Sequence, residues 1–338
     1  RGGCDVLPPT TKKQRVKWLL FRTLASFNLH KPLLRKSQPL SSLVPQDVET
    51  NLKKLFRDKD VVFSFYIPAP LPPDRLVAQV MSRRGKTVCF VKIGLLESGK
   101  RRIESEIKAL KTVSRFNTDV FRTPDVLFDC ERDGMRFVGI SAVPRNSRPV
   151  CRLTPAILRF LASLQRDGRT SVTNSPYWEE LRVLVSSYCG DARATIEAAF
   201  AKAEEILEGV EIDFGWCHGD FAPWNLRRYA DRFFVIDWEM LHKGFALIDA
   251  CFFVVQREIF MKRRGHYSVW RRLLTGREMA VARRMLYPDL EDTAFNALVM
   301  VGLIDCEVRR ARFFKDYGQR APSRSVRSEI LEIWLRSG

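Results

Sequence analysis

The sequence WCHGDFAPWNLRRYADRFFVIDWE occupies residues 216–239 and places small polar side chains between apolar runs. Gly219 and Pro223 oppose a regular helix in its first part, so we expect a loop there. The segments NLRRY and FFVIDW flank the turn-prone residues ADR, which predicts a β-hairpin. The two ends of this hairpin carry Asn225 and Asp237, which the hairpin brings side by side.

Asn225 and Asp237 offer an amide oxygen and a carboxylate at the open end of the predicted hairpin. Oxygen ligands of this kind suit a hard divalent cation such as Mg²⁺, whose remaining positions go to water and phosphate. We therefore predict Asn225 and Asp237 as the metal ligands. Asp220, just upstream, is left to accept a proton from an attacking hydroxyl.

The order His-x-Asp-x-x-x-x-Asn, followed by the IDW of VIDWE, resembles the aminoglycoside phosphotransferase and choline kinase group. The downstream segment GFALIDACFF is similar to the Gly-x-x-x-x-Asp element of that group. The resemblance covers roughly residues 61–253. It implies an α+β, two-lobed protein-kinase-like fold, with a small antiparallel-sheet N-lobe carrying one helix and a larger, mostly helical C-lobe.

The resemblance also assigns roles within the polar stretch. It implies a kinase that transfers the γ-phosphoryl group of ATP in the presence of Mg²⁺, with Asp220, Asn225 and His218 as the catalytic set. In this fold His218 is expected to brace the catalytic loop by hydrogen bonds more than to transfer protons. Asp249 would be a helix-start or loop-bracing residue.

Nucleotide-binding residues are implied upstream of residue 144. Lys92, in CFVKIG, would contact the α- and β-phosphates, and Glu106 on the following helix would hold it, with Glu104 as the alternative. The hinge that hydrogen-bonds adenine would comprise Ser141, Ala142 and Val143. The junction between the first two strands departs from the group, because IPAPLPPDR has no glycine and its prolines offer no amide to a phosphate.

Hydrophobic periodicity gives the element order. Residues 60–143 predict three strands, a helix and two strands, because runs rich in Val, Phe and Ile flank one amphipathic segment. After Pro149 the pattern is mostly helical, beginning with a helix over 154–168. The predicted divisions are a basic N-terminal extension and linker (1–48), the N-lobe (49–143) and the helical C-lobe with catalytic loop and acceptor site (144–338).

Composition fits a globular chain of 338 residues with 46% hydrophobic and 28% charged residues. The longest apolar run, FALIDACFFVV, is too short to cross a bilayer and is expected to be a buried helix. The eight cysteines are scattered without metal-binding spacing, which indicates buried thiols and a cytoplasmic location. The net charge of +18 favours a solvated basic surface over a nucleic-acid site, because no nucleic-acid-binding motif accompanies it.

The charge of the C-terminal residues limits the class of acceptor molecule that we expect. Basic residues outnumber acidic ones from residue 257 onward, so a polycation would be repelled and we expect a neutral or anionic acceptor: a sugar, a glycan, a lipid-linked intermediate or a phosphorylated metabolite. Four alternatives stay open: a pseudokinase or scaffold, an aminoglycoside- or choline-type kinase, a metal-dependent hydrolase using His218, Asp220 and Asp237, and a basic nucleic-acid binder. The amphipathic stretch 16–27 is expected to pack on protein, or alternatively to lie on an anionic membrane.

Overall fold

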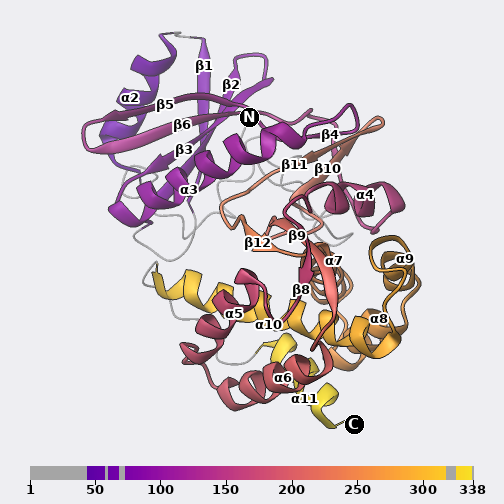
Figure 1. Ribbon diagram of the computed structural model, residues 1–338. Coiled ribbons are helices and arrows are strands. Elements are labelled where there is room, and N and C mark those ends of the chain that lie inside the picture. The colour runs from indigo at the N-terminus through magenta and orange to yellow at the C-terminus, as the bar shows by residue number, and fades with distance from the viewer. Residues whose placement is uncertain (1–43, 58–59, 68–72, 317–324, 337–338) are drawn as a thin grey trace. The chain divides into compact units, whose positions relative to one another are not determined.

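A computed structural model describes residues 44–57, 60–67, 73–316 and 325–336 of the chain (Figure 1). Its residues fall into two compact units. Of the described residues, those up to Arg148 and those of Arg228–Phe234 form the first unit, and those of Pro149–Arg227 and from Val235 onward form the second. The amphipathic stretch 16–27 lies outside the described residues.

The first unit is built on a five-stranded sheet of order β1-β2-β3-β6-β5, in which all neighbours are antiparallel. Its strands are β1 (Val61–Tyr66), β2 (Arg75–Ser82), β3 (Thr87–Gly94), β5 (Val126–Arg132) and β6 (Met135–Ser141). The helix α3 (Glu97–Val113) follows β3 and packs against β3 and β6 (Figure 1). Ile103, Ile107 and Leu110 are buried on its inner face, at helical spacing. The predicted order of three strands, a helix and two strands is confirmed for this sheet, and the structure adds the two-residue strand β4 (Phe121–Arg122) between α3 and β5.

Helix α2 (Gln46–Phe56) corrects one expectation, because the segment assigned to a linker ends inside it. Pro45 lies directly before the helix, and Asp47 and Glu49 occupy its first turn, where their negative charges interact favourably with the positive end of the helix dipole. Val48 and Leu52 are fully buried in the core of the first unit. Burial of these two side chains extends the unit upstream of β1.

A smaller sheet uses chain segments that are distant in sequence. Strand β4 (Phe121–Arg122), after the short 3-10 turn Ser114–Phe116, pairs in parallel with β11 (Arg232–Val235). Phe121 and Phe233 stack with ring centroids 4.9 Å apart. Strand β11 is joined to β10 (Leu226–Tyr229) through a two-residue turn, so the predicted hairpin is confirmed.

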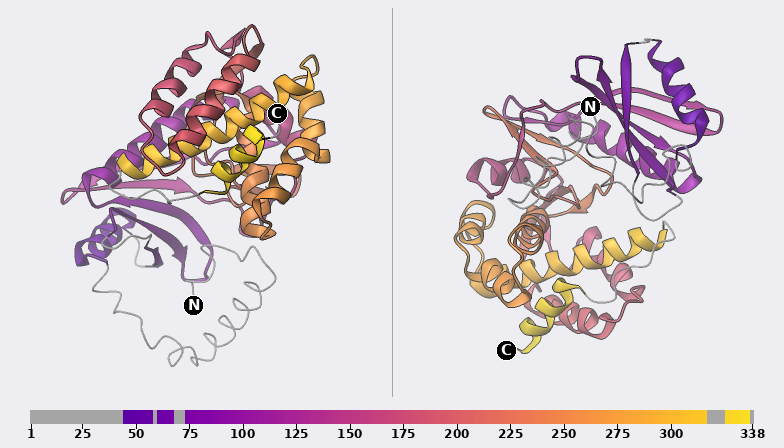
Figure 2. Two further views of the ribbon diagram at one scale, coloured as in Figure 1. Left: turned by 90° about the horizontal axis from the view of Figure 1, so that it is seen from below. Right: turned by 180° about the vertical axis from the view of Figure 1, so that it is seen from behind.

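The second unit is mainly helical. Its helices are α4 (Pro155–Ser163), α5 (Pro176–Ser186), α6 (Arg193–Ile206), α7 (Ala246–Gln256), α8 (His266–Thr275), α9 (Arg277–Leu286), α10 (Asp292–Asp316) and α11 (Val326–Arg336), with a π-helical turn at Arg257–Met261. The long helix α10 packs against α5, α6 and α7 (Figure 2). Helix α7 is buried along its whole length, as the run FALIDACFFVV predicted.

A three-stranded antiparallel sheet of order β12-β9-β8 was missed by the sequence analysis. Its strands are β8 (Gly168–Ser171), β9 (Glu211–Cys217) and β12 (His242–Gly244), and the short β7 (Arg148–Pro149) precedes α4. The helix predicted over 154–168 ends at Ser163, and Gly168, with φ 99°, begins β8.

The cysteines differ in their burial. The described cysteines are all free, and four of them are buried, whereas Cys151 and Cys189 are exposed, so the expectation of buried thiols is wrong for these two. No helix within the described residues combines the length and the apolar character needed to cross a membrane.

Candidate active site

The loop of residues 218–225 leaves the sheet at Cys217, whose neighbour across the ladder is His242. It contains no helical turn, as Gly219 and Pro223 predicted. Gly219 has φ +78°, and a Cβ atom there would collide with the Met240 carbonyl oxygen and the His242 ring. Only glycine therefore fits this turn of the loop.

Asp249, in the first turn of α7, holds the start of this loop. Its Oδ2 accepts a hydrogen bond from the backbone N–H of His218 at 2.7 Å, and its Oδ1 accepts one from Gly219 at 3.0 Å. The carboxylate is 1% exposed, and burial raises its pKa to about 6 although both amides oppose the rise. The loop-bracing role expected for Asp249 is confirmed.

His218 is fully buried and uses both ring nitrogens within the site. The backbone N–H of Asp220 donates to Nδ1 at 3.2 Å, so Nε2 carries the proton and donates to the Ile236 carbonyl at 3.0 Å. Burial lowers the pKa of His218 to about 4, which keeps the imidazole neutral. The ring thus ties the loop to the chain that enters Asp237.

Asp220 and Asn225 are joined directly. Asn225 Nδ2 donates to Asp220 Oδ2 and to the Asp220 carbonyl, both at 2.9 Å. Because both bonds use the amide nitrogen, Oδ1 of Asn225 is the atom that can bind a cation. The Asp220 side chain is 24% exposed, and burial raises its pKa to about 7, with further contributions from the charges of Asp237 and Glu239.

Asp237 follows strand β11 at the open end of the hairpin. Ile236 N–H donates to the Asn225 carbonyl at 3.0 Å, which sets Asn225 beside the segment that carries Asp237. Asp237 has φ +68°, a left-handed conformation that is uncommon for a residue with a side chain and concentrates at functional sites.

The oxygen atoms at the open end of the hairpin are of the type that binds a divalent cation. The charges of Asp237 and Glu239 raise the pKa of Asp220, so the three groups lie close enough to repel one another. A bound cation would remove this repulsion, and carboxylate and amide oxygens are the ligands that Mg²⁺ takes. Within the described ranges no cluster of three or more His, Cys, Asp or Glu ligands is present.

The structure adds Arg310, which the sequence analysis missed. Its guanidinium lies 3.8 Å from Asp220 Oδ1, packs near the rings of Phe252 and Phe314, and opposes the rise in the pKa of Asp220. It comes from α10, far along the chain. No local pattern in the sequence marks it.

The lysine and glutamate of the first unit form the expected pair. Lys92 Nζ on β3 lies 2.5 Å from Glu106 Oε2 on α3, and both side chains are largely buried, at 14% and 4% exposure. The alternative, Glu104, instead pairs with Lys108 at 2.8 Å. The structure therefore selects Glu106 as the partner of Lys92.

The expected hinge residues lie at the end of β6. Ser141 is its last residue and bonds to Asp125 twice: its backbone N–H donates to the Asp125 carbonyl at 2.9 Å, and its Oγ accepts from the Asp125 N–H at 2.8 Å. Ala142 and Val143 follow the strand and are half-buried. Part of the glycine-free junction, 68–72, lies outside the described residues.

Comparison with known proteins gives the family. The model of the phosphotransferase enzyme family matches residues 90–267. The chain belongs to this family. The matched range includes Lys92, Glu106, the loop and Asp249 of this phosphotransferase. No curated protein sequence matches it significantly.

Solved structures share the fold of this phosphotransferase. Choline kinase LicA from Streptococcus pneumoniae is 15% identical, with a TM-score of 0.54 over 87% of this chain and 100% of that one. Aminoglycoside phosphotransferase APH(4)-Ia is 13% identical, with a TM-score of 0.56 over 87% and 99%. A thermostable APH(4)-Ia mutant, solved with ADP and hygromycin B, gives 13% and 0.54 over the same shares. The predicted α+β, kinase-like fold is confirmed.

Replacing Gly219 by alanine is expected to destabilise the second unit more than the same change at Gly209. Both glycines have positive φ, 78° and 72°, so alanine costs about 1–2 kcal/mol of backbone strain at either position. At Gly209 no atom lies within 4 Å of the added Cβ, whereas at Gly219 the Met240 carbonyl must move. Urea unfolding measures both changes, and equal losses would contradict the packing described for the loop.

Proposed function

We propose that this phosphotransferase is an ATP- and Mg²⁺-dependent kinase that phosphorylates a hydroxyl group of a neutral or anionic small molecule, such as a sugar, a glycan or a lipid-linked intermediate. The observation that carries the proposal is the joined set Asp220, Asn225 and Asp237, held by a braced loop and a hairpin. This set offers one proton acceptor and two oxygen ligands within one short segment of chain.

Asp220 is the proposed catalytic base. The acceptor oxygen attacks the γ-phosphorus, the bond from phosphorus to the β–γ bridging oxygen breaks, and ADP leaves with that electron pair. The hydroxyl proton passes to Asp220, and burial raises the pKa of this carboxylate, which makes it a stronger base than an exposed aspartate. Arg310, beside Asp220 Oδ1, helps to keep the carboxylate ionised.

Asn225 Oδ1 and Asp237 would hold Mg²⁺. When bound, the cation neutralises the phosphates and the charge that develops on them. Asn225 has a second task, because its amide nitrogen fixes the rotamer of Asp220. Asn225 would thereby both bind the metal and orient the base.

Nucleotide-contacting roles are proposed for residues of the first unit. Lys92, held by Glu106, would contact the α- and β-phosphates, and the buried pair keeps the ammonium charged and oriented. Ser141, Ala142 and Val143 would contact adenine, with the backbone of Ser141 already fixed by Asp125.

His218 is proposed as a positioning residue and not as a proton carrier. Both its ring nitrogens are occupied, one by the Asp220 amide and the other by the Ile236 carbonyl. The same two bonds weaken the alternative of a hydrolase that uses His218 as a metal ligand, since a metal would have to displace one of them. With Asp249, His218 fixes the loop on two sides.

The acceptor and location remain proposals from charge and cysteine usage. Helices α8 and α9 carry an excess of arginine, which disfavours a polycationic acceptor. One structural neighbour was solved in complex with hygromycin B and another is a choline kinase, but these compounds are stated for those proteins and not for this chain. A cytoplasmic location is in keeping with free thiols in all the described cysteines.

A thermal melting experiment tests the nucleotide part of the proposal. ATP with Mg²⁺ at a hundred times its dissociation constant should stabilise the folded protein by about 2.7 kcal/mol, which raises Tm by a few degrees. Transfer of label from γ-³²P-ATP to pooled sugars, choline and aminoglycosides then identifies the acceptor class. No shift at millimolar ATP or GTP would contradict the proposal, and preferred labelling of choline or an aminoglycoside would contradict its acceptor class.

A further inference from the structure

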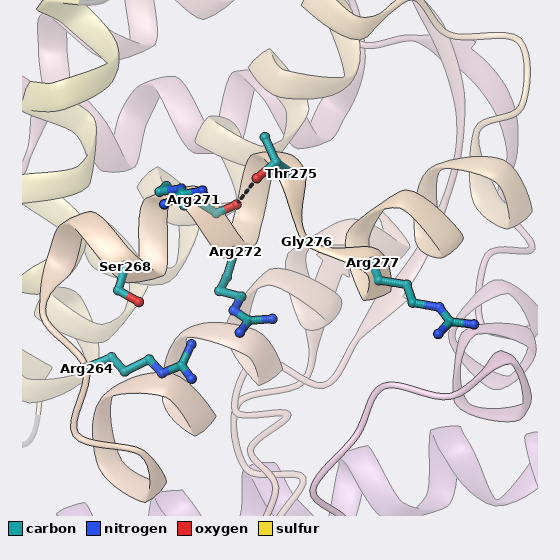
Figure 3. Close-up of a pocket in the computed structure, with 7 residues that line it drawn as sticks. All are labelled: Arg264, Ser268, Arg271, Arg272, Thr275, Gly276 and Arg277. Carbon is teal, nitrogen blue, oxygen red and sulfur yellow. Dashed lines mark hydrogen bonds between the residues drawn. The ribbon is translucent and has the colours of Figure 1, made fainter.

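Two adjoining cavities in the second unit are lined by arginine. The first, about 340 Å³, is bordered by α8, the start of α9 and the segment before α8 (Figure 3). Its walls contain four arginines, two hydroxyl side chains and one glycine, and no carboxylate. The arginines are Arg264, Arg271, Arg272 and Arg277.

The second cavity, about 750 Å³, shares Arg272, Gly276 and Arg277 with the first. The one carboxylate in its wall is Glu278, and this group already binds Arg257 at 2.6 Å and accepts the backbone N–H of Leu153 at 2.9 Å. The two cavities therefore form a continuous basic surface whose single acidic side chain is neutralised.

A second carboxylate near the cavities, that of Glu258, is also neutralised by basic side chains. Glu258 is fully buried and is contacted by Arg257, Lys262 and Arg264, at 2.8, 2.9 and 3.4 Å. The remaining arginines of the first cavity, Arg271, Arg272 and Arg277, form no ion pair with any residue in the described part of the chain. Positive charge thus stays uncompensated in the cavity walls.

The arrangement of the side chains suits an anion. In Figure 3 the side chains of Arg264 and Arg272 extend toward the same space, with Ser268 on the same side, whereas Arg271 and Arg277 extend away from it. Guanidinium groups bind phosphate and carboxylate through paired hydrogen bonds. The volumes match those of cavities that hold small ligands.

The chain that lines these cavities also touches the catalytic loop. Phe260, in the π-helical turn, is 60% exposed and packs edge-on against Trp224, with ring centroids 5.9 Å apart. Trp224 directly precedes Asn225 in the loop. The same π-helical turn supplies Arg257 and is followed by Lys262, both in the wall of the second cavity. Isolated π-helical turns occur frequently at functional sites.

We propose that the two cavities are a binding site for a phosphate group carried by the acceptor, which makes the acceptor a phosphorylated small molecule with a free hydroxyl. This inference rests on the proposed kinase function for the identity of the ligand as acceptor. The binding of a phosphate group by Arg272 and Arg277 does not depend on it.

Calorimetric titration with inorganic pyrophosphate in EDTA tests the site without nucleotide or metal. We compare the wild type with Arg272→Gln/Arg277→Gln, and with the control Arg159→Gln/Arg284→Gln, which removes the same charge from exposed positions on α4 and α9. Loss of charge-assisted hydrogen bonds should weaken binding about tenfold or more in the first variant, with the control close to the wild type. Equal affinities for all three proteins would overturn the site.

Matched acceptors test the second half of the inference. Glucose and glucose 6-phosphate, and mannose and mannose 6-phosphate, are offered with γ-³²P-ATP to the same three proteins. We expect transfer to a phosphorylated member, with KM for it raised about tenfold or more in Arg272→Gln/Arg277→Gln and KM for ATP unchanged. Transfer to neutral sugars alone, with equal KM values, would overturn the acceptor assignment. Pyrophosphate binding without any MgATP melting shift would instead show that the kinase function fails while the anion site stands.

Discussion

Asp220→Asn is expected to lower kcat by about 10²–10⁴, the usual contribution of a general base, while the melting shift with MgATP is kept. Asparagine has the shape of aspartate and can still accept the hydrogen bond from Asn225 through its oxygen, but it cannot take the hydroxyl proton. Steady-state phosphate transfer, with the melting shift as a check on nucleotide binding, measures the effect. Activity within tenfold of the wild type would remove Asp220 from the role of base.

The same substitution should stabilise the metal-free protein, in a pH-dependent way. The folded pKa of Asp220, about 7, lies above the unfolded value of 3.8, so its ionisation opposes folding. The penalty is absent below pH 3.8, develops as the pH rises toward 7 and is complete above it, at up to about 4 kcal/mol. In EDTA, the advantage of Asp220→Asn over the wild type should therefore grow between pH 5 and pH 8. A constant difference would show that Asp220 is not held in a destabilising environment.

Arg310→Met provides a related comparison for Asp220. Removal of the guanidinium takes away one of the influences that lower the pKa of Asp220, while the methionine side chain can still pack near Phe252 and Phe314. The variant thus separates the charge next to the base from the packing around it.

The site residues that sequence reasoning located are those joined by short stretches of chain. Gly219 and Pro223 exclude a helix, the turn ADR specifies the hairpin, and the hairpin alone brings Asn225 toward Asp237. The hairpin contact follows from local geometry, so the order of residues suffices to predict it. The Lys92–Glu106 pair was expected from the family resemblance, which left Glu104 open, and the structure places Lys92 against Glu106.

Contacts made across long sequence separations could not be predicted in this way. Arg310 reaches Asp220 from α10, and β8 joins β9 after two intervening helices. Sequence periodicity shows which face of a helix is buried but not which distant group it meets. Helix α2 was missed for a different reason, because Pro45 was taken as part of a linker although proline also precedes helices.

Asp237→Asn is expected to abolish the part of the MgATP melting shift that requires Mg²⁺, about 2.7 kcal/mol of stabilisation when the ligand is at a hundred times its dissociation constant. Asparagine is chosen over alanine because Asp237 has φ +68°, a conformation that asparagine adopts more readily than most residues. The backbone can then keep its course, and the change reports on the carboxylate charge that a hard cation requires.

Asp231→Asn is the matched control for Asp237→Asn. It makes the same chemical change at the tip of the hairpin, where the side chain is fully exposed and lies 3.8 Å from Arg228. Removal of one charge from this surface should leave the melting shift intact, since an exposed ion pair contributes little. If both variants kept the shift, Asp237 would not be a metal ligand, and its left-handed backbone would need another explanation. If both lost it, the hairpin itself, and not the Asp237 carboxylate, would be what nucleotide binding requires.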